Sequence, residues 1–143
     1  MQLKDYIPKL KNKYNDISFS GISFDSSKVK KNNIFFAIKG NETDGNKFID
    51  SAIKKGAKII FTEKKKLRKK KGILYFYSSN VRKLLSEVSY KMIKKKPKKL
   101  VAVTGTNGKS SIADFYFQIL NFNFKKVASI GTIGLKCPNF KKT

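Results

Sequence analysis

The chain has 143 residues, of which 40% are apolar and 13% aromatic, and its formal net charge is +24. This length suits one domain, or one small domain and part of another, and it is enough to bury a core. No apolar run reaches the roughly 18–20 residues of a membrane span, and a chain with one Cys and no His has no internal disulfide and little to hold zinc. Because no apolar signal segment follows Met1 either, we expect a soluble cytoplasmic protein.

The high positive charge raises the question of nucleic-acid binding. Only Arg68 and Arg82 are arginines, however, and every other basic residue is a lysine. Arginine forks suit phosphate and base recognition better than lysines do. The lysines are also spread along the whole chain, which favours a generally solvated surface over a nucleic-acid footprint.

The first third of the chain contains two predicted strands. Residues 2–13 fit a short helix interrupted near Pro8, and Phe19–Phe24 alternates as a half-buried strand does. The turn residues Asp25-Ser26-Ser27 follow. Ile34–Ile38 is a continuous apolar run, which predicts a buried strand.

The middle third predicts one helix and two more strands. A polar loop at residues 40–45 leads into a helix whose apolar residues lie between 48 and 53, and Gly56 is placed to end it. Residues 58–62 and 73–77 then predict strands, separated by a lysine-rich loop.

A third helix is predicted to begin after Asn80, a good N-cap, and to bury one face. That face comprises Val81, Leu84, Leu85, Val88, Met92 and Ile93. Residues 94–99 resemble a linker, after which strand, loop, helix (109–121) and strand (126–130) follow. The alternation predicts an α/β fold: a small α/β domain, then the start of a parallel-sheet, phosphate-loop domain.

The segment Leu100 to Ser111 carries the clearest chemical signal. A strand-like run enters a glycine turn that ends in Gly108-Lys109-Ser110, and a helix follows. Such loops hold nucleotide phosphates with backbone N–H groups, a lysine on the phosphates and a hydroxyl on Mg²⁺. Val103 stands where the general motif has its first glycine, and an ordinary strand-to-helix turn is the alternative. The predicted phosphate-binding residues are Gly105, Thr106, Asn107, Gly108, Lys109, Ser110 and Ser111.

Five sequence blocks occur in an order that resembles the Mur ligases of peptidoglycan synthesis. They begin at Phe24 (Phe-Asp-Ser-Ser), Ile34, Thr43 (Thr-Asp-Gly), Val101 and Ser129, and the resemblance runs from about residue 17 to 134, most of the chain. The resemblance is strongest to the branch that adds the third residue of the muramoyl peptide. It implies a UDP-substrate-binding domain over residues 1–97 and the beginning of the ATP-binding domain over 98–143.

Functional residues follow from this resemblance position by position. Phe24 and Ser26 would lie at the uridine nucleotide, with Asn41, Glu42 and Thr43 in the loop beside it. Residues 105–111 would hold ATP, with Lys109 on the phosphates as the catalytic cation and Ser110 on Mg²⁺. Two departures are visible: Ser27 replaces the family's usual arginine, and the loop ends Lys-Ser-Ser rather than Lys-Thr-Thr.

The implied reaction is ATP-driven amide formation on UDP-N-acetylmuramoyl-L-alanyl-D-glutamate through an acyl phosphate. The incoming diamino acid is meso-diaminopimelate or L-lysine, and the resemblance implies a monomer without membrane insertion. Since family members are several times longer, we expect these residues to be an N-terminal fragment without ligase activity of its own. The alternatives are a ligase that adds D-Ala-D-Ala, a non-catalytic nucleotide-binding module, or a basic nucleic-acid-binding module.

Overall fold

A computed structural model describes residues 1–8, 10, 14–65, 70–138 and 140–142. The chain divides into two compact units, Met1–Lys96 and Pro97–Thr143.

The first unit is built on a parallel sheet of four strands in the order β1-β2-β3-β4. The strands are β1 (Gly21–Ser23), β2 (Asn33–Ala37), β3 (Ala57–Thr62) and β4 (Leu74–Tyr77). The helices around them are α1 (Leu3–Tyr6), the short 3-10 turns η2 (Ser26–Lys28) and η3 (Gly45–Phe48), α2 (Ile49–Lys54) and α3 (Val81–Met92). Because all four strands are parallel, their carboxyl ends meet at one edge of the sheet.

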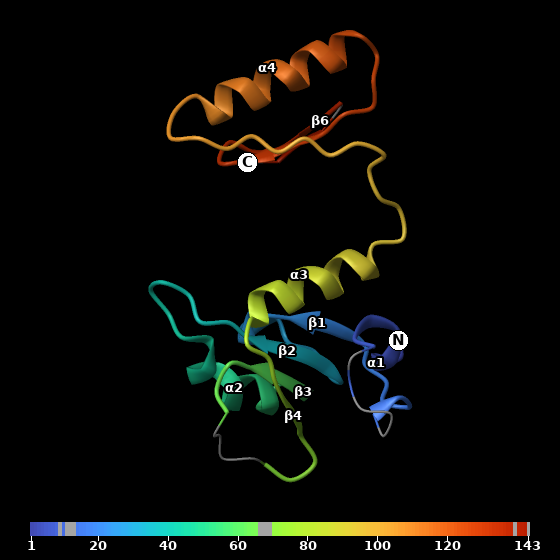
Figure 1. Ribbon diagram of the computed structural model, residues 1–143, viewed down its shortest axis with the longest axis vertical. Coiled ribbons are helices and arrows are strands. Elements are labelled where there is room, and N and C mark those ends of the chain that lie inside the picture. The colour runs from blue at the N-terminus through green and yellow to red at the C-terminus, as the bar shows by residue number, and fades with distance from the viewer. Residues whose placement is uncertain (9, 11–13, 66–69, 139, 143) are drawn as a thin grey trace. The chain divides into compact units, whose positions relative to one another are not determined.

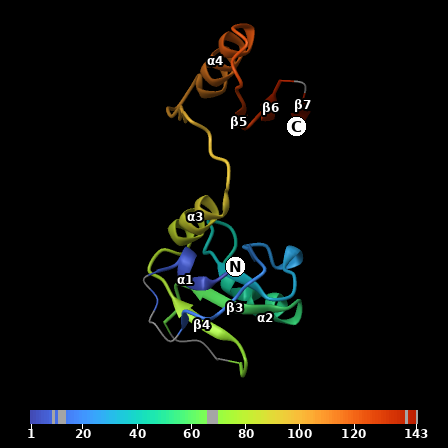
Figure 2. The same cartoon turned by 90° about the vertical axis from the view of Figure 1, so that its right-hand side faces the viewer.

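The sheet is buried on both faces, which explains the continuous apolar runs of β2 and β3. Successive side chains of a strand point to opposite faces, so Phe36 and Phe61 join one core while Phe35 and Ile60 join the other. The helices α3 and α2 cover these two faces (Figures 1 and 2).

Aromatic rings form the centre of the α3-side core. The Phe61 ring stacks on Phe36 with centroids 5.3 Å apart and on Phe76 with centroids 5.2 Å apart. Since Phe61 and Phe76 are also register partners in β3 and β4, this stack ties neighbouring strands together.

Most predicted elements of the first unit are confirmed. The four strands form within one to two residues of their expected ends. The first helix is shorter than predicted, since α1 covers Leu3–Tyr6, and residues 9 and 11–13 lie outside the described residues. Gly56 ends α2 with a φ of +109°, and the Asn80 side chain caps α3 by accepting a hydrogen bond from the Lys83 N–H.

The second unit differs from expectation in its strands. It contains α4 (Lys109–Phe122), close to the predicted helix, and an antiparallel sheet of β5 (Ser129–Gly131), β6 (Gly134–Cys137) and β7 (Phe140–Lys142). The prediction of a strand at 100–103 is wrong, and the described residues of the second unit form no parallel sheet. The strands β5, β6 and β7 are close in sequence and pair with one another as antiparallel neighbours. Although α4 is long enough to serve as a crossover, residues 100–103 pair with no strand among the described residues.

Helix α4 exposes a row of large apolar side chains. Ile112, Phe115, Ile119 and Phe122 are between 55% and 84% exposed and recur at helical spacing. Within the described ranges, no helix combines the length and apolar character that crossing a bilayer would take.

Candidate functional site

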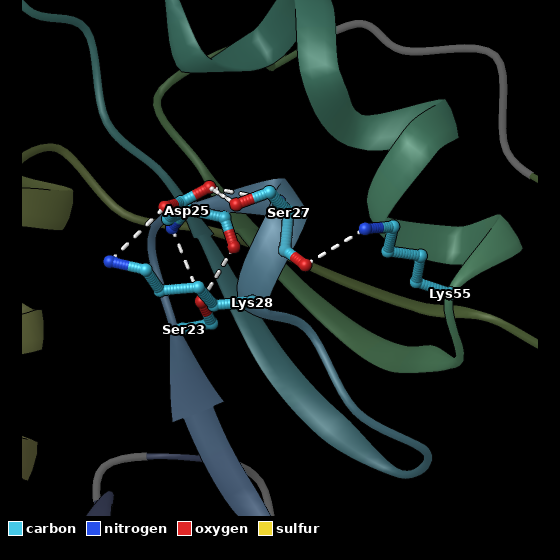
Figure 3. A network of polar contacts seen from close by, with 5 residues as sticks. All are labelled: Ser23, Asp25, Ser27, Lys28 and Lys55. Carbon is cyan, nitrogen blue, oxygen red and sulfur yellow. Dashed lines mark hydrogen bonds and ion pairs between the residues drawn. The ribbon is translucent and has the colours of Figure 1, made fainter.

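A network of polar contacts shapes the turn after β1 (Figure 3). One Asp25 carboxylate oxygen accepts hydrogen bonds from the Ser27 N–H at 2.8 Å and the Ser27 hydroxyl at 2.7 Å. The Ser23 hydroxyl donates to the Asp25 carbonyl at 2.7 Å, and the Lys55 ammonium donates to the Ser27 carbonyl at 2.8 Å. Ser26 therefore begins a turn whose backbone is fixed on both sides.

These contacts give the Asp25 carboxylate an acid-shifted titration. The pKa of Asp25 is lowered, first by the hydrogen bond from the Ser27 hydroxyl and next by that from its backbone N–H. Ionised Asp25 therefore stabilises this turn above the ordinary aspartate pKa of about 3.9. The contribution is lost as the pH falls through the lowered pKa of the folded state.

We expect Ser27→Ala to move the pKa of Asp25 part of the way back toward the ordinary aspartate value, because the hydroxyl donor is lost while the Ser27 N–H and Lys28 remain. A carboxyl-carbon NMR titration measures this shift directly. Asp44 is the internal control, since its pKa is lowered by hydrogen bonds from the backbone and side chain of Asn46 and not by Ser27. An unchanged Asp25 titration would show that the hydroxyl contributes nothing.

The loop after β2 is closed at its base by backbone hydrogen bonds. The Gly40 N–H donates to the Thr43 carbonyl at 2.9 Å, and the Gly45 N–H donates to the Ile38 carbonyl at 2.9 Å. Gly45 is needed because a Cβ there would lie 2.5 Å from the Ile38 oxygen. The loop thus holds its shape without the side chains at its tip.

Asp44 anchors the far side of this loop to β3. Its carboxylate accepts hydrogen bonds from Asn46 at 2.9 and 2.6 Å and pairs with the Lys64 ammonium at 3.3 Å. The Thr62 hydroxyl at the end of β3 donates to the Asn46 side chain at 2.5 Å. With these residues committed to the anchor, Asn41 and Glu42 remain exposed at the tip.

A hollow of about 740 Å³ lies between this loop and helix α3. One wall comes from the strand ends and the loop: Phe24, Ile38, Gly40, Thr43, Gly45 and Phe48. The opposite wall is one stripe of α3 and the residue after it: Arg82, Leu85, Ser86, Ser89, Tyr90 and Ile93. Half of these residues carry apolar or aromatic side chains, so the hollow offers apolar contact together with a few polar groups, as ligand pockets do.

A smaller, more polar hollow of about 540 Å³ shares residues with the first. It is lined by Gly40, Asn41, Glu42, Thr43 and Arg82. The two hollows thus bring together Phe24, Asn41, Glu42 and Thr43 among the predicted residues. Ser26 lies in the adjoining turn but lines neither hollow.

The polar residues that α3 contributes to the wall of the hollow were not predicted from the sequence. Val81, Leu84 and Val88 pack into the core as predicted, whereas Arg82, Ser86 and Ser89 were not singled out. The spacing of these three, at i, i+4 and i+7, places them on one stripe and was an available signal. The stripe lines the hollow only because α3 starts beside the loop after β2.

Two contacts fix where α3 starts. The Asn80 side chain accepts from the Lys83 N–H at 2.8 Å, and the Glu63 carboxylate accepts from the Val81 N–H at 3.0 Å. A helix N-terminus has unsatisfied N–H groups, and here Glu63, the residue after β3, supplies one of their partners. The first turn of α3 is thereby tied to the carboxyl edge of the sheet.

In the second unit, the predicted phosphate loop adopts a backbone that requires its glycines. Gly105 has a φ of +143° and Gly108 a φ of +72°, both unfavourable for residues with a Cβ. Gly108 is the N-cap of α4 and, having no side chain, leaves the first-turn N–H groups uncapped. Such N–H groups at a helix start bind anions.

The Lys109 ammonium folds back over this loop. It donates to the Gly105 carbonyl and, at 2.8 Å, to the Thr106 carbonyl. Ser110 and Ser111 follow in the first turn of α4. Backbone N–H groups, an ammonium and hydroxyls form a donor set that fits a nucleotide phosphate. For a divalent cation, Ser110 offers one oxygen, and the described residues form no cluster of three or more acidic, His or Cys side chains.

A family model and the relatives found by sequence comparison indicate the same protein family. The model of the "Mur ligase family, catalytic domain" matches residues 18–103. A UDP-N-acetylmuramoyl-L-alanyl-D-glutamate–2,6-diaminopimelate ligase of Rickettsia conorii is 44% identical over 89% of the chain and 26% of its own length. The enzyme of the same name from Clostridium tetani is 41% identical over 93% of the chain and 29% of its own length.

Solved structures agree with the sequence relatives. A structure of a UDP-N-acetylmuramoyl-L-alanyl-D-glutamate–2,6-diaminopimelate ligase has a TM-score of 0.76 at 23% identity, over 98% of the chain and 29% of the solved one, and supports the fold. A MurF ligase from Thermotoga maritima in complex with ADP has a TM-score of 0.53 at 26% identity, over 71% of the chain and 23% of the solved one. The chain thus spans about a quarter of the length of the curated relatives it matches.

Proposed function

The chain belongs to the Mur ligase family, and on this basis we propose that it provides the UDP-substrate site and the ATP phosphate loop of a peptidoglycan-precursor ligase. The proposed substrate is UDP-N-acetylmuramoyl-L-alanyl-D-glutamate. The proposed second substrate is 2,6-diaminopimelate, after the names of the relatives. As part of such a ligase, it would act in the cytoplasm as a monomer and serve cell-wall synthesis, and with it cell shape and division.

The observation that carries the proposal is the hollow at the carboxyl edge of the parallel sheet. Open α/β sheets bind ligands at this edge. Phe24 is 65% exposed and lies on its wall, where an aromatic ring can stack on a pyrimidine. The polar loop tip, Asn41 to Thr43, adjoins the same space and offers hydrogen-bonding groups for the ribose and phosphates.

The glycine loop of the second unit is the proposed ATP site. Its first-turn N–H groups would bind phosphate oxygens, and the Lys109 ammonium would exchange its two carbonyl partners for the β- and γ-phosphates. The Ser110 hydroxyl would be one ligand of Mg²⁺, which supplies charge neutralisation when bound. Asn107 and Ser111 complete the loop on either side of Gly108-Lys109-Ser110.

The proposed chemistry is formation of an amide bond at the expense of ATP. The D-glutamate carboxylate would attack the γ-phosphorus of ATP, so that the bond to ADP breaks, ADP leaves and an acyl phosphate forms. The amine of the diamino acid would then attack the acyl carbon, which releases phosphate and a proton as the amide bond forms. In this scheme the first unit holds the UDP end of the substrate. Lys109 holds the transferring phosphoryl group and neutralises its charge, and positioning of this kind accounts for most of phosphoryl-transfer catalysis.

We expect the chain to bind UDP-N-acetylmuramoyl-L-alanyl-D-glutamate in isothermal titration calorimetry, with UDP preferred over CDP. Phe24→Ala should weaken binding about tenfold, the effect of removing one aromatic contact of ~1.4 kcal/mol. Phe122→Ala is the matched control, because that ring is also exposed (84%) but lies on α4. Equal affinity for UDP and CDP, or full affinity in Phe24→Ala, would contradict the assignment.

A further inference from the structure

Among the residues of α3, Arg82 alone lines both hollows, the larger one and the smaller, more polar one. It is also the only arginine among the described residues, since Arg68 lies outside them. Every other side chain on the two walls is neutral except Glu42. Among the residues that line the two hollows, Arg82 is therefore the only one with a positive charge.

The backbone that carries Arg82 is held on both sides. Val81, the preceding residue, is fully buried, and its N–H is bound by Glu63. Lys83, the following residue, has its N–H bound by the cap residue Asn80, and it lines neither hollow. The start of the helix is thus fixed with the residue at position 82 turned toward the site.

The Arg82 guanidinium is unengaged within the described part of the chain. It forms no hydrogen bond and no ion pair there, although Glu42 lines the same small hollow. An arginine presents five N–H donors in a planar fork, a geometry that matches phosphate oxygens bidentately. The Arg82 guanidinium lies where the two hollows meet. It is therefore suited to bind an anionic group that links two parts of one ligand.

We propose that Arg82 binds the diphosphate of the uridine nucleotide. The inference rests on the proposed function, since it assumes that the base occupies the larger hollow beside Phe24 and Leu85. With the base there, an extended ligand crosses from apolar to polar walls at Thr43 and Arg82. The diphosphate is the part of such a ligand that lies next to the base and ribose.

The test compares uridine with UDP on the full chain and on three variants. Arg82→Ala should weaken UDP binding ten- to a hundredfold, the order expected for a lost charge-assisted hydrogen bond, and leave uridine binding unchanged. Arg82→Lys should recover part of the loss, because charge returns without the fork. Lys83→Ala removes an equal charge one residue away and should bind UDP as the parent chain does.

The outcomes separate this inference from the proposed function. If the parent chain binds uridine and UDP but Arg82→Ala binds both equally well, only the role of Arg82 is refuted. If Arg82→Ala loses uridine and UDP to the same extent, Arg82 acts on the fold and the inference fails. If Lys83→Ala loses as much UDP affinity as Arg82→Ala, the effect is general charge, which also refutes it. If the parent chain binds neither ligand, the proposed function falls and the inference falls with it.

Discussion

Gly45→Ala is expected to disrupt the loop after β2 and to abolish measurable UDP binding. The added Cβ would lie 2.5 Å from the Ile38 oxygen and 2.8 Å from its nitrogen, and neither backbone atom can move without distorting the end of β2. It would also break the hydrogen bond from the Gly45 N–H to Ile38. We expect a loss of about 3 kcal/mol, the upper end of overpacking costs.

Amide hydrogen exchange of β2 and β3 measures this loss within the first unit alone. A destabilisation of that size should speed exchange about a hundredfold. Gly72→Ala is the control: its Cβ would meet nothing within 4 Å, but its φ is +78°, so only backbone strain is introduced. If both variants exchange alike, the close approach to Ile38 is not what requires glycine at position 45.

Phe61→Ala is expected to have the largest effect on stability. Phe61 is 1% exposed, lies in the central strand β3 and stacks on rings from both neighbouring strands. Truncation leaves a cavity between Phe36 and Phe76, which typically costs about 3–5 kcal/mol. For a unit of this size that is a large share of the free energy of unfolding.

Exchange of the β3 amides, together with circular dichroism, gives the readout for this variant. Phe24→Ala deletes an equal side chain that is 65% exposed, and it should change stability by less than about 0.5 kcal/mol. A Phe61→Ala chain as stable as Phe24→Ala would mean that the stacked rings are not the centre of the core.

The first unit could be predicted well because its local signals agree with its tertiary environment. The apolar run Ile34–Ile38 indicates a strand buried on both faces, and β2 is one. Asn80 and Gly56 are specific helix signals whose effect requires only neighbouring residues. The loop residues Asn41 to Thr43 were predicted as substrate-binding residues through their place in a motif, not through any property of their own.

The role of Arg82 and the lack of pairing at residues 100–103 could not be predicted, because they depend on tertiary contacts that the local sequence does not encode. Arg82 looks like any solvated helical residue until the position of α3 against the loop is known. The run Leu100–Val103 has strand character, but a strand exists only where a partner pairs with it. The turn between Gly131 and Gly134 is short enough to join antiparallel neighbours, a signal for β6 that was present and overlooked.

In the loop after β2, the residues that hold the backbone differ from the residues at the tip that face the proposed ligand. Its base is closed by main-chain hydrogen bonds at Gly40 and Gly45, and its anchor is Asp44, so the side chains of Asn41 and Glu42 take no part in holding it. Substitutions at these two positions can therefore alter which ligand is preferred without the fold having to compensate. The tip is a natural place to randomise in a library that seeks altered nucleotide-sugar selectivity.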